Sequence, residues 1–164
     1  MRRIYRKVVA LFGVALLVAV GLFAIDEFWR DIPGLTDCDT QLCCETCENI
    51  PVDSVIDGDT FVSGPFRVRL FGIDAPEVGE RCSSVATVRL RSLAGNNVRV
   101  ELGPRTEDPF GRLLYYLYTE AGDSIDETLV REGLAVAWTG DGQHRELLMD
   151  VERRARDDGV GCLW

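Results

Sequence analysis

The stretch RVRLFGIDAPE, residues 67–77, decides the fold. In its first half the apolar Val68 and Leu70 alternate with Arg67 and Arg69. Alternation with a period of two predicts a β-strand that buries one face and exposes the other. The stretch therefore supplies one strand of a sheet, and its second half carries two carboxylates beyond the end of that strand.

A break in this strand is expected at Gly72. Regular alternation places Arg69 and Asp74 on opposite faces of a strand, because they are an odd number of residues apart. Both side chains reach one site only where the strand bulges or ends between them, and a glycine is the natural position for that. Arg67 shares the face of Arg69 and competes with it as a candidate for the same site.

Other strands and helices are predicted on both sides of this stretch. Alternating apolar residues predict strands around the turn at 57–60, at 98–102 and at 113–118. Capping residues and helical periodicity predict helices from Ser83 or Ser84 to about residue 95, from Ser124 or Asp126 to Gly133, and at 143–156. Strands interleaved with helices in this way predict an α+β fold, a small β-barrel with three helices.

Two acidic clusters and two arginines are spaced through the same half of the chain. They are Asp57-Gly58-Asp59-Thr60, Arg69, Asp74-Ala75-Pro76-Glu77 and Gly111-Arg112. Clustered carboxylates bind a hard divalent cation, and arginines beside it clamp a phosphate and stabilise transition-state charge. A further carboxylate positions or deprotonates a water. Phosphodiester hydrolysis needs these groups, although a hairpin turn and surface ion pairs are the alternative explanation for each motif alone.

Four motifs occur in one order: VIDGDTF at 55–61, RVRLFGIDAPE, DPFGR at 108–112 and IDETLVREGLA at 125–135. Over residues 52–164 the chain therefore resembles the staphylococcal nuclease (thermonuclease) family. The resemblance implies a five-stranded β-barrel of the oligonucleotide-binding (OB) type with three helices. It also implies an enzyme, a Ca²⁺-dependent phosphodiesterase whose substrates are DNA and RNA.

The resemblance assigns the metal to three positions. These are the carboxylates of Asp59 and Asp74 and the backbone carbonyl of Ala75, where a threonine is common in the family. Asp57 shares a side with Asp59 in an extended chain and is expected behind the metal ligands. Few protein ligands and several waters suit Ca²⁺, which accepts loose coordination by oxygen.

The same resemblance gives the remaining motif residues their catalytic roles. Glu77 is expected to position or activate the attacking water, and Pro76 stiffens its approach. Arg69 and Arg112 are expected to hold the phosphate and its transition state, because the guanidinium fork matches phosphate oxygens.

Substrate binding is where the chain departs from the family. Pro109-Phe110 stands where relatives often have Lys-Tyr, so a cation and a phenol are missing. Phe110 retains only the ability to stack. Trp138 follows the GLA motif and is a candidate for stacking on a nucleobase, with a place in the core as the alternative. A catalytically silent module that binds single-stranded nucleic acid or a protein is the competing functional hypothesis, and no obligate protein partner is inferred.

The net charge of −9 is unusual for a protein that approaches a polyanion. Lys7 is the only lysine, so the positive charge rests almost entirely on arginine. Either adaptation to high salt, where repulsion is screened, or a codon bias explains this composition. In both cases long-range electrostatic steering of nucleic acid is expected to be poor.

The N-terminal part predicts export. Arg2, Arg3, Arg6 and Lys7 precede an uncharged run at 8–25, which is just long enough to cross a bilayer. Residues 1–25 are therefore predicted to be a signal anchor, or a signal peptide cleaved near residue 21. Residues 26–51 follow as an acidic, cysteine-rich stalk, and 52–164 form the nuclease-like domain. Both alternatives place that domain outside the cytoplasm, either membrane-anchored through residues 8–25 or secreted.

Six cysteines agree with export, because disulfides persist in oxidising compartments. Cys38, Cys43, Cys44 and Cys47 crowd the stalk, while Cys82 and Cys162 lie within the domain. The simplest division is a Cys82–Cys162 bridge and two bridges among the other four. Six cysteines allow fifteen pairings, and a zinc site in the stalk is the alternative for the first four.

Overall fold

Strand β4 (Phe66–Leu70) lies inside the sheet, between β7 and β3, and its register explains why the motif folds as it does. The computed structural model describes residues 38–164. In β4 the side chains of Val68 and Leu70 are fully buried, while Arg67 is exposed. The alternation in the sequence thus becomes one apolar face against the core and one polar face.

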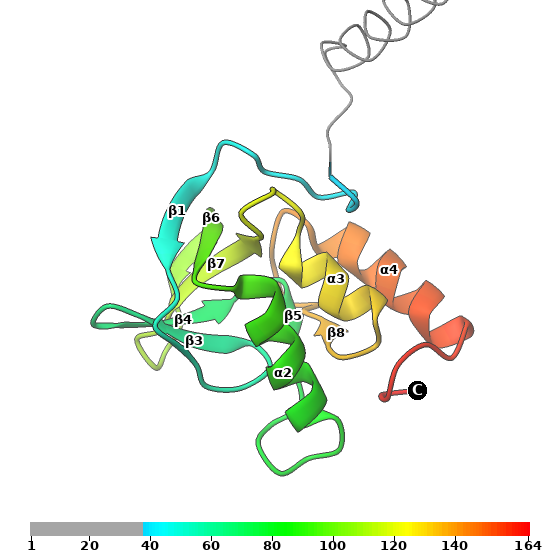
Figure 1. Cartoon of the computed structure of the whole chain (residues 1–164). Coiled ribbons are helices and arrows are strands. Elements are labelled where there is room, and N and C mark those ends of the chain that lie inside the picture. The colour runs from blue at the N-terminus through cyan, green and yellow to red at the C-terminus, as the bar shows by residue number, and fades with distance from the viewer. Residues whose placement is uncertain (1–37) are drawn as a thin grey trace, which may run out of the picture. The chain divides into compact units, whose positions relative to one another are not determined.

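The chain forms a curled sheet with helices packed along one side, as Figure 1 shows. Among the described residues the sheet has six strands in the order β1-β6-β7-β4-β3-β2, antiparallel except for the β4–β7 pair. The other bounds are β1 Glu48–Pro51, β2 Ser54–Val55, β3 Thr60–Ser63, β6 Asn97–Glu107 and β7 Leu113–Tyr118. Strands β5 (Ile73–Asp74) and β8 (Val136–Ala137) form a separate pair, and the helices are α2 Ser83–Ala94, α3 Ile125–Arg131 and α4 Arg145–Asp157.

This arrangement fits the predicted α+β fold of OB type, with one difference in the strand count. We expected five strands, and the sheet has six within residues 38–164 because β1 pairs with β6. Strand β1 comes from the segment predicted to be a stalk. Among the described residues, the compact unit therefore includes this part of the predicted stalk.

The predicted break at Gly72 is present. Strand β4 ends at Leu70, and the chain resumes pairing in β5 at Ile73. A Cβ atom at Gly72 would lie 2.5 Å from a side-chain carbon of Leu148, so only glycine fits there. The Gly72 N–H donates to the buried carboxylate of Asp126 (3.1 Å). The break is therefore fixed by packing and by a hydrogen bond from the far side of the core.

The helix starts follow the predictions only in part. Ser124 caps α3, since its Oγ accepts a hydrogen bond from the Glu127 N–H (3.1 Å). Neither Ser83 nor Ser84 caps α2. The residue before α2 is Cys82, which has a left-handed φ of 76° and makes no side-chain capping bond. The Cys82 side chain instead forms a disulfide bond with Cys162, near the C-terminus.

The disulfides of residues 38–164 divide as the simplest pairing expects. Cys82 joins Cys162, while Cys38 pairs with Cys43 and Cys44 with Cys47. No free cysteine remains in the described part of the chain. The alternative of a zinc site therefore has no thiolate to draw on in this structure.

The predicted membrane segment at 8–25 lies outside the described residues. Within 38–164, none of the helices has the length and apolar character needed to span a bilayer. The anchor, the signal peptide and the first part of the stalk stay predictions.

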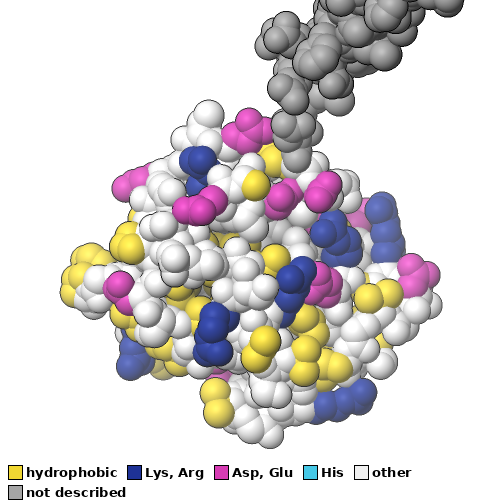
Figure 2. All heavy atoms as spheres, viewed as in Figure 1, with side chains coloured by type: hydrophobic (Ala, Val, Ile, Leu, Met, Phe, Trp, Pro, Cys, Tyr) yellow, Lys and Arg dark blue, Asp and Glu magenta, His cyan; other side chains and the backbone are white. Residues whose placement is uncertain are grey.

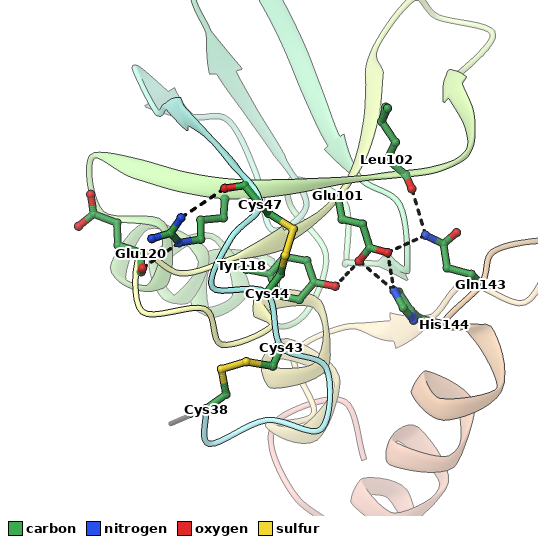
Figure 3. Close-up of a disulfide and its surroundings, with 11 residues drawn as sticks. Cys38, Cys43, Cys44, Cys47, Glu101, Leu102, Tyr118, Glu120, Gln143 and His144 are labelled. Atoms are coloured by element: carbon green, nitrogen blue, oxygen red, sulfur yellow. Dashed lines mark hydrogen bonds and ion pairs between the residues drawn. A yellow bond between two sulfur atoms is a disulfide. The ribbon is translucent and has the colours of Figure 1, made fainter. Parts of the chain in front are cut away.

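His144 lies directly before α4. Its side chain makes no capping bond. Its Nε2 contacts the Glu101 carboxylate at 3.0 Å, and its ring packs edge-on against Tyr116. Tyr118 Oη and Gln143 Nε2 donate to the same carboxylate (Figure 3). Glu101 thus joins β6, β7 and the start of α4.

Glu101 should make the stability of the fold sensitive to acid. Burial acts to raise the pKa of this carboxyl, but the hydrogen bonds from its three neighbours outweigh burial and hold the pKa below its ordinary value of 4.5. A carboxyl with a lowered folded-state pKa stabilises the fold above its unfolded-state pKa. That stabilisation is lost as the pH falls through the lowered value.

We therefore expect Glu101→Gln to unfold more easily than wild type at neutral pH and to lose less stability between about pH 5 and pH 3. Urea unfolding at several pH values measures both effects. Glu146→Gln is the control, because Glu146 is 79% exposed on α4 and pairs only with Arg145 among the described residues. An unchanged acid dependence in Glu101→Gln would contradict the assignment.

Candidate active site

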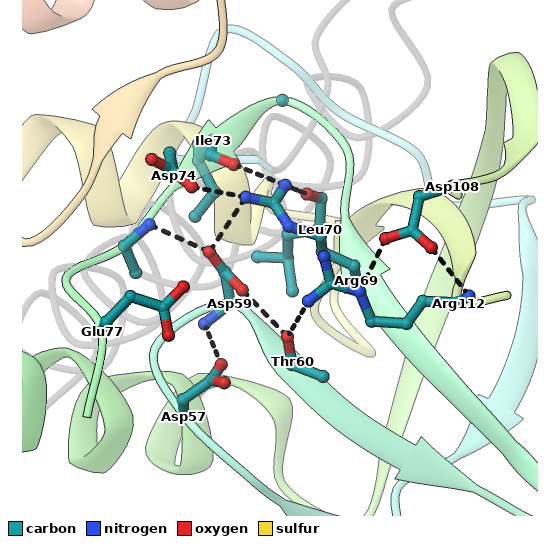
Figure 4. Close-up of polar contacts among 12 residues, drawn as sticks. Asp57, Asp59, Thr60, Arg69, Leu70, Ile73, Asp74, Glu77, Asp108 and Arg112 are labelled. Carbon is teal, nitrogen blue, oxygen red and sulfur yellow. Dashed lines mark hydrogen bonds and ion pairs between the residues drawn. The ribbon is translucent and has the colours of Figure 1, made fainter. Parts of the chain in front are cut away.

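The predicted site residues meet where the start of β3, the end of β4 and β5 come together (Figure 4). Asp59 directly precedes β3, Arg69 is near the end of β4, and Asp74 is in β5. Thr60 pairs with Arg69 in the β3–β4 register, and Leu70 N–H donates to the Asp59 carbonyl (2.9 Å). The break at Gly72 then turns Asp74 back toward Arg69.

Asp59 is the buried carboxylate of the site, with 6% of the residue exposed. Its Oδ2 accepts a hydrogen bond from Ala75 N–H (3.0 Å), and its Oδ1 accepts one from the Thr60 hydroxyl (2.9 Å). Asp57 Oδ1 accepts from the Asp59 N–H (3.1 Å), so Asp57 supports the turn. Burial raises the pKa of Asp59, while the neighbouring Arg69 acts to lower it.

Arg69 lies between the two carboxylates of the site. Its Nη2 donates to Asp74 Oδ1 at 2.5 Å and lies 3.3 Å from Asp59 Oδ2. Its Nη1 donates to the Leu70 and Ile73 carbonyls, at 3.0 Å each. Within residues 38–164 its Nε makes no hydrogen bond, so one N–H of the guanidinium has no partner there. The side chain is 12% exposed, so this donor is fixed in place.

The donor set fits a divalent cation held mainly by oxygen. Asp59 Oδ2 and Asp74 Oδ1 both lie within 3.3 Å of one nitrogen, so the two oxygens face a common point. Asp74 is exposed, which leaves it free to exchange the guanidinium for an ion. No three carboxylates converge among residues 38–164. A divalent ion would therefore rest on Asp59, Asp74, the Ala75 carbonyl and waters.

Arg112 reaches the site from the turn between β6 and β7. Gly111 adopts a φ of 75°, which lets the chain reverse sharply. Asp108 Oδ2 accepts a hydrogen bond from Arg112 Nε (2.7 Å), and its Oδ1 accepts from the Arg112 and Phe110 N–H groups. Arg112 Nη1 also contacts the Thr60 hydroxyl at 3.3 Å. The arginine is thus held beside the residue that follows Asp59.

Asp108 is a functional residue that the motif reading missed. Burial acts to raise its pKa, but the hydrogen bonds from Arg112 and Phe110 outweigh burial and lower it. The carboxylate therefore stays ionised and orients the guanidinium. The Asp-Pro pair four residues before Arg112 was an available signal, since aspartate bonding to its own following backbone is typical of turns.

Glu77 extends from the loop after β5 and is exposed. Figure 4 shows it near Asp59 and Asp57. Its N–H donates to Glu80 Oε2 (2.9 Å), which fixes its backbone, while its own carboxylate makes no hydrogen bond within the described part of the chain. A carboxylate that is exposed and unpaired there is free to accept a proton from water.

A cleft of about 480 Å³ opens beside the two arginines. Trp138 and Phe110 both line it, at 38% and 84% exposure. Trp138 is therefore at the surface, and the alternative that it belongs to the core does not hold. The cleft also includes residues outside the predicted set, namely Phe71, Arg105, Asp108, Pro109, Leu114 and Asp141.

Comparison with known proteins agrees with this geometry. The family model described as staphylococcal nuclease homologue matches residues 67–164, more than half of the chain. The chain belongs to the staphylococcal nuclease family. The matched region contains Arg69, Asp74, Glu77 and Arg112, while Asp59 lies just before it.

Several relatives support the membership in the staphylococcal nuclease family. The chain is 32% identical to the micrococcal nuclease of Shigella flexneri over 161 residues, covering 93% of this chain and 81% of that protein. It is 30% identical to the thermonuclease of Staphylococcus intermedius over 123 residues, covering 66% and 72%. It is 31% identical to endonuclease YhcR of Bacillus subtilis over 104 residues, which cover 51% of this chain and only 8% of that much longer protein. It likewise spans only 46% of endonuclease YncB from the same organism.

Proposed function

We propose that this chain is a metal-dependent nuclease that hydrolyses phosphodiester bonds of DNA and RNA, and that its ion is Ca²⁺. The observation that carries the proposal is the meeting of Asp59, Asp74 and Arg69 beside Arg112. Two converging carboxylates, two oriented guanidinium groups and one unpaired carboxylate form a set that phosphate chemistry needs. Relatives named thermonuclease, micrococcal nuclease and endonuclease support a nuclease activity.

Each residue has a separate task in this reaction. Asp59, Asp74 and the Ala75 carbonyl would hold the ion, which supplies positive charge that polarises the phosphate when it is bound. Arg112 and the Nε of Arg69 bind the phosphate oxygens. Because the transition state carries more charge on these oxygens than the substrate does, donors already oriented toward it lower the barrier.

Glu77 takes the proton from the attacking water. The water oxygen forms the new bond to phosphorus, and the bond to the leaving oxygen breaks. The leaving oxygen acquires a proton from solvent, and Glu77 later returns its proton to solvent. Because the Glu77 carboxylate is exposed, both transfers have a path to bulk water.

Substrate approach depends on short-range contacts. Arginine and acidic side chains are interspersed on the face that Figure 2 shows, in keeping with the net charge of −9. Such a surface supplies little long-range attraction to a polyanion. Affinity therefore comes from the cleft beside Arg69 and Arg112 and from the ion.

We further propose that the domain works outside the cytoplasm. Three disulfides within residues 38–164 support this, since such bonds are rare where thiols are kept reduced. The hypothesis of a catalytically silent binding module lacks support, because such a module has no need to retain Asp59, Glu77 and Arg112 together.

The test is hydrolysis of single-stranded DNA, duplex DNA and RNA by the full chain, with Ca²⁺, with Mg²⁺ or with excess chelator. We expect activity with Ca²⁺ and none with chelator. Ca²⁺ should also raise the melting temperature of wild type but not that of Asp74→Asn, because ion binding stabilises only the folded state. Asp150→Asn on α4 is the control. Full activity in chelator would refute the metal dependence.

A further inference from the structure

Asp141 joins two other side chains of the cleft. Its Oδ2 accepts a hydrogen bond from Arg105 Nε (2.6 Å), and its Oδ1 accepts one from Arg105 Nη2 (3.0 Å). The same Oδ1 accepts a hydrogen bond from the Trp138 indole Nε1–H (3.0 Å). One carboxylate therefore sets the orientation of both an indole and a guanidinium. The roles assigned above to the catalytic residues do not account for this group.

The indole is held on several sides. The backbone N–H of Trp138 donates a hydrogen bond to the Gly72 carbonyl (2.8 Å). This bond links Trp138 to the strand break that turns Asp74 toward the site. A Cβ atom at Gly140 would lie 2.9–3.0 Å from three atoms of the indole, so the chain passes directly against the ring. Yet Trp138 remains 38% exposed and lines the cleft. A fixed aromatic ring thus faces solvent beside the reactive residues.

The guanidinium of Arg105 is fixed as well. The Cζ atom of Arg105 lies 5.3 Å from the centre of the Phe71 ring, and its Nε and Nη2 donate hydrogen bonds to Asp141. The hydrogen bonds from Arg105, and then from Trp138, lower the pKa of Asp141, so the carboxylate is ionised at neutral pH. The ion pair of Arg105 and Asp141 therefore carries no net charge. Such a surface suits the flat face of a base better than it suits a phosphate.

Trp138 is already a candidate for stacking on a nucleobase; we propose that Asp141 is the positioning residue that fixes its indole, together with Arg105, for one unpaired base. The inference rests on the proposed function, since the cleft serves a nucleic acid only if that function holds. A base stacks on the indole only when its own face is free, so the subsite selects single-stranded regions over duplex. Asp141 acts through Trp138 and Arg105 and touches no reacting atom.

The test is a binding measurement that does not depend on hydrolysis. Short single-stranded oligodeoxynucleotides with phosphorothioate linkages, each with one abasic position, are titrated against the full chain in the presence of Ca²⁺. Binding is read as the fluorescence anisotropy of a dye attached to the 5′ end of each oligonucleotide, so the same readout serves every variant. We expect one abasic position to weaken wild-type binding about tenfold, the size of one stacked base. In Asp141→Ala and Trp138→Ala this position-specific penalty should vanish, and the intact oligonucleotide should bind about tenfold more weakly.

Kinetics separate positioning from catalysis. For Asp141→Ala we expect KM on single-stranded DNA to rise about tenfold while kcat stays within about twofold, because the lost contact serves substrate and transition state alike. Asp141→Asn should keep part of the effect, since its amide oxygen still accepts the indole N–H. Asp150→Ala, which removes the Asp150–Arg153 ion pair on α4, should match wild type.

The outcomes distinguish this inference from the function on which it rests. A wild-type chain that shows no abasic penalty at any position has no such subsite. An Asp141→Ala chain that keeps the full penalty removes Asp141 from the role. Either result leaves hydrolysis intact as a separate observation. Conversely, a chain that binds with the expected penalty but never hydrolyses the substrate would overturn the proposed function and leave the subsite standing.

Discussion

Arg112→Ala should lower the rate of phosphodiester hydrolysis about 10²–10³-fold, the usual cost of removing one oriented charged donor. The guanidinium is held by Asp108 and contacts Thr60, so it needs no reorganisation when charge develops on the phosphate. Its side chain is 25% exposed and lies outside the core, so the domain should stay folded. The measurement is kcat on single-stranded DNA with saturating Ca²⁺.

Glu77→Ser should produce a loss of similar size, about 10²–10⁴-fold, for a different reason. The carboxylate is exposed and accepts no hydrogen bond from residues 38–164, so no contact within the folded unit requires it there. Removing it should leave the melting temperature unchanged while the attacking water loses its proton acceptor.

Arg153→Ala provides the matched control for both variants, since its side chain is 64% exposed on α4 and pairs only with Asp150 in the described region. We expect Asp108→Asn to have an effect between that of the control and that of Arg112→Ala. It keeps an acceptor for the backbone bonds of the turn but weakens the hold on Arg112, so it should lower kcat less than Arg112→Ala does. Near-wild-type turnover in either Arg112→Ala or Glu77→Ser would overturn the role given to that residue.

The parts of this fold that follow from local pattern were predictable. The alternation through Val68 and Leu70 indicated β4, and the capping preference of Ser124 indicated α3. The break at Gly72 was predictable because two motif side chains had to reach one site. In each case the sequence holds the physical cause within a few residues, either a period of two, a capping hydroxyl or a missing side chain.

The missed elements depend on partners far along the chain. Strand β1 is mostly exposed, and its short sequence ENIP has no period, so only its pairing with β6 defines it. Cys82 sits in a left-handed conformation before α2, where a serine cap was expected, and its side chain is bonded to Cys162. Local propensity carries no information on such contacts.

The candidate site, like the fold, was predictable only in part. Motifs identified the residues that meet at the candidate active site. They did not identify the residues that hold those side chains, namely Asp108 for Arg112, Asp126 for Gly72 and Asp141 for Trp138. Only the Asp126–Gly72 bond joins distant segments, 54 residues apart, while the other two lie within one loop each, over 4 and 3 residues. A supporting carboxylate looks like any other acidic residue until its partner is placed beside it.

Loss of the Cys82–Cys162 bridge should cause the largest change in stability. The two residues are 80 apart in sequence, and their Cα atoms lie 5.8 Å from each other. In the chain-entropy model a loop of this length contributes about 4–5 kcal/mol to the free energy of unfolding. We expect the Cys82→Ser/Cys162→Ser variant to lose up to about this amount and to melt roughly 10–15 °C lower.

The short bridge Cys38–Cys43 is the matched control, because its residues are only 5 apart. The same model gives this loop about 2 kcal/mol, so the Cys38→Ser/Cys43→Ser variant should be clearly more stable than the variant without the long bridge. Urea unfolding of the two oxidised variants beside wild type measures the difference. Equal losses would show that loop length does not set the contribution of these bridges. No loss in the Cys82→Ser/Cys162→Ser variant would mean that packing alone holds the C-terminus against the start of α2.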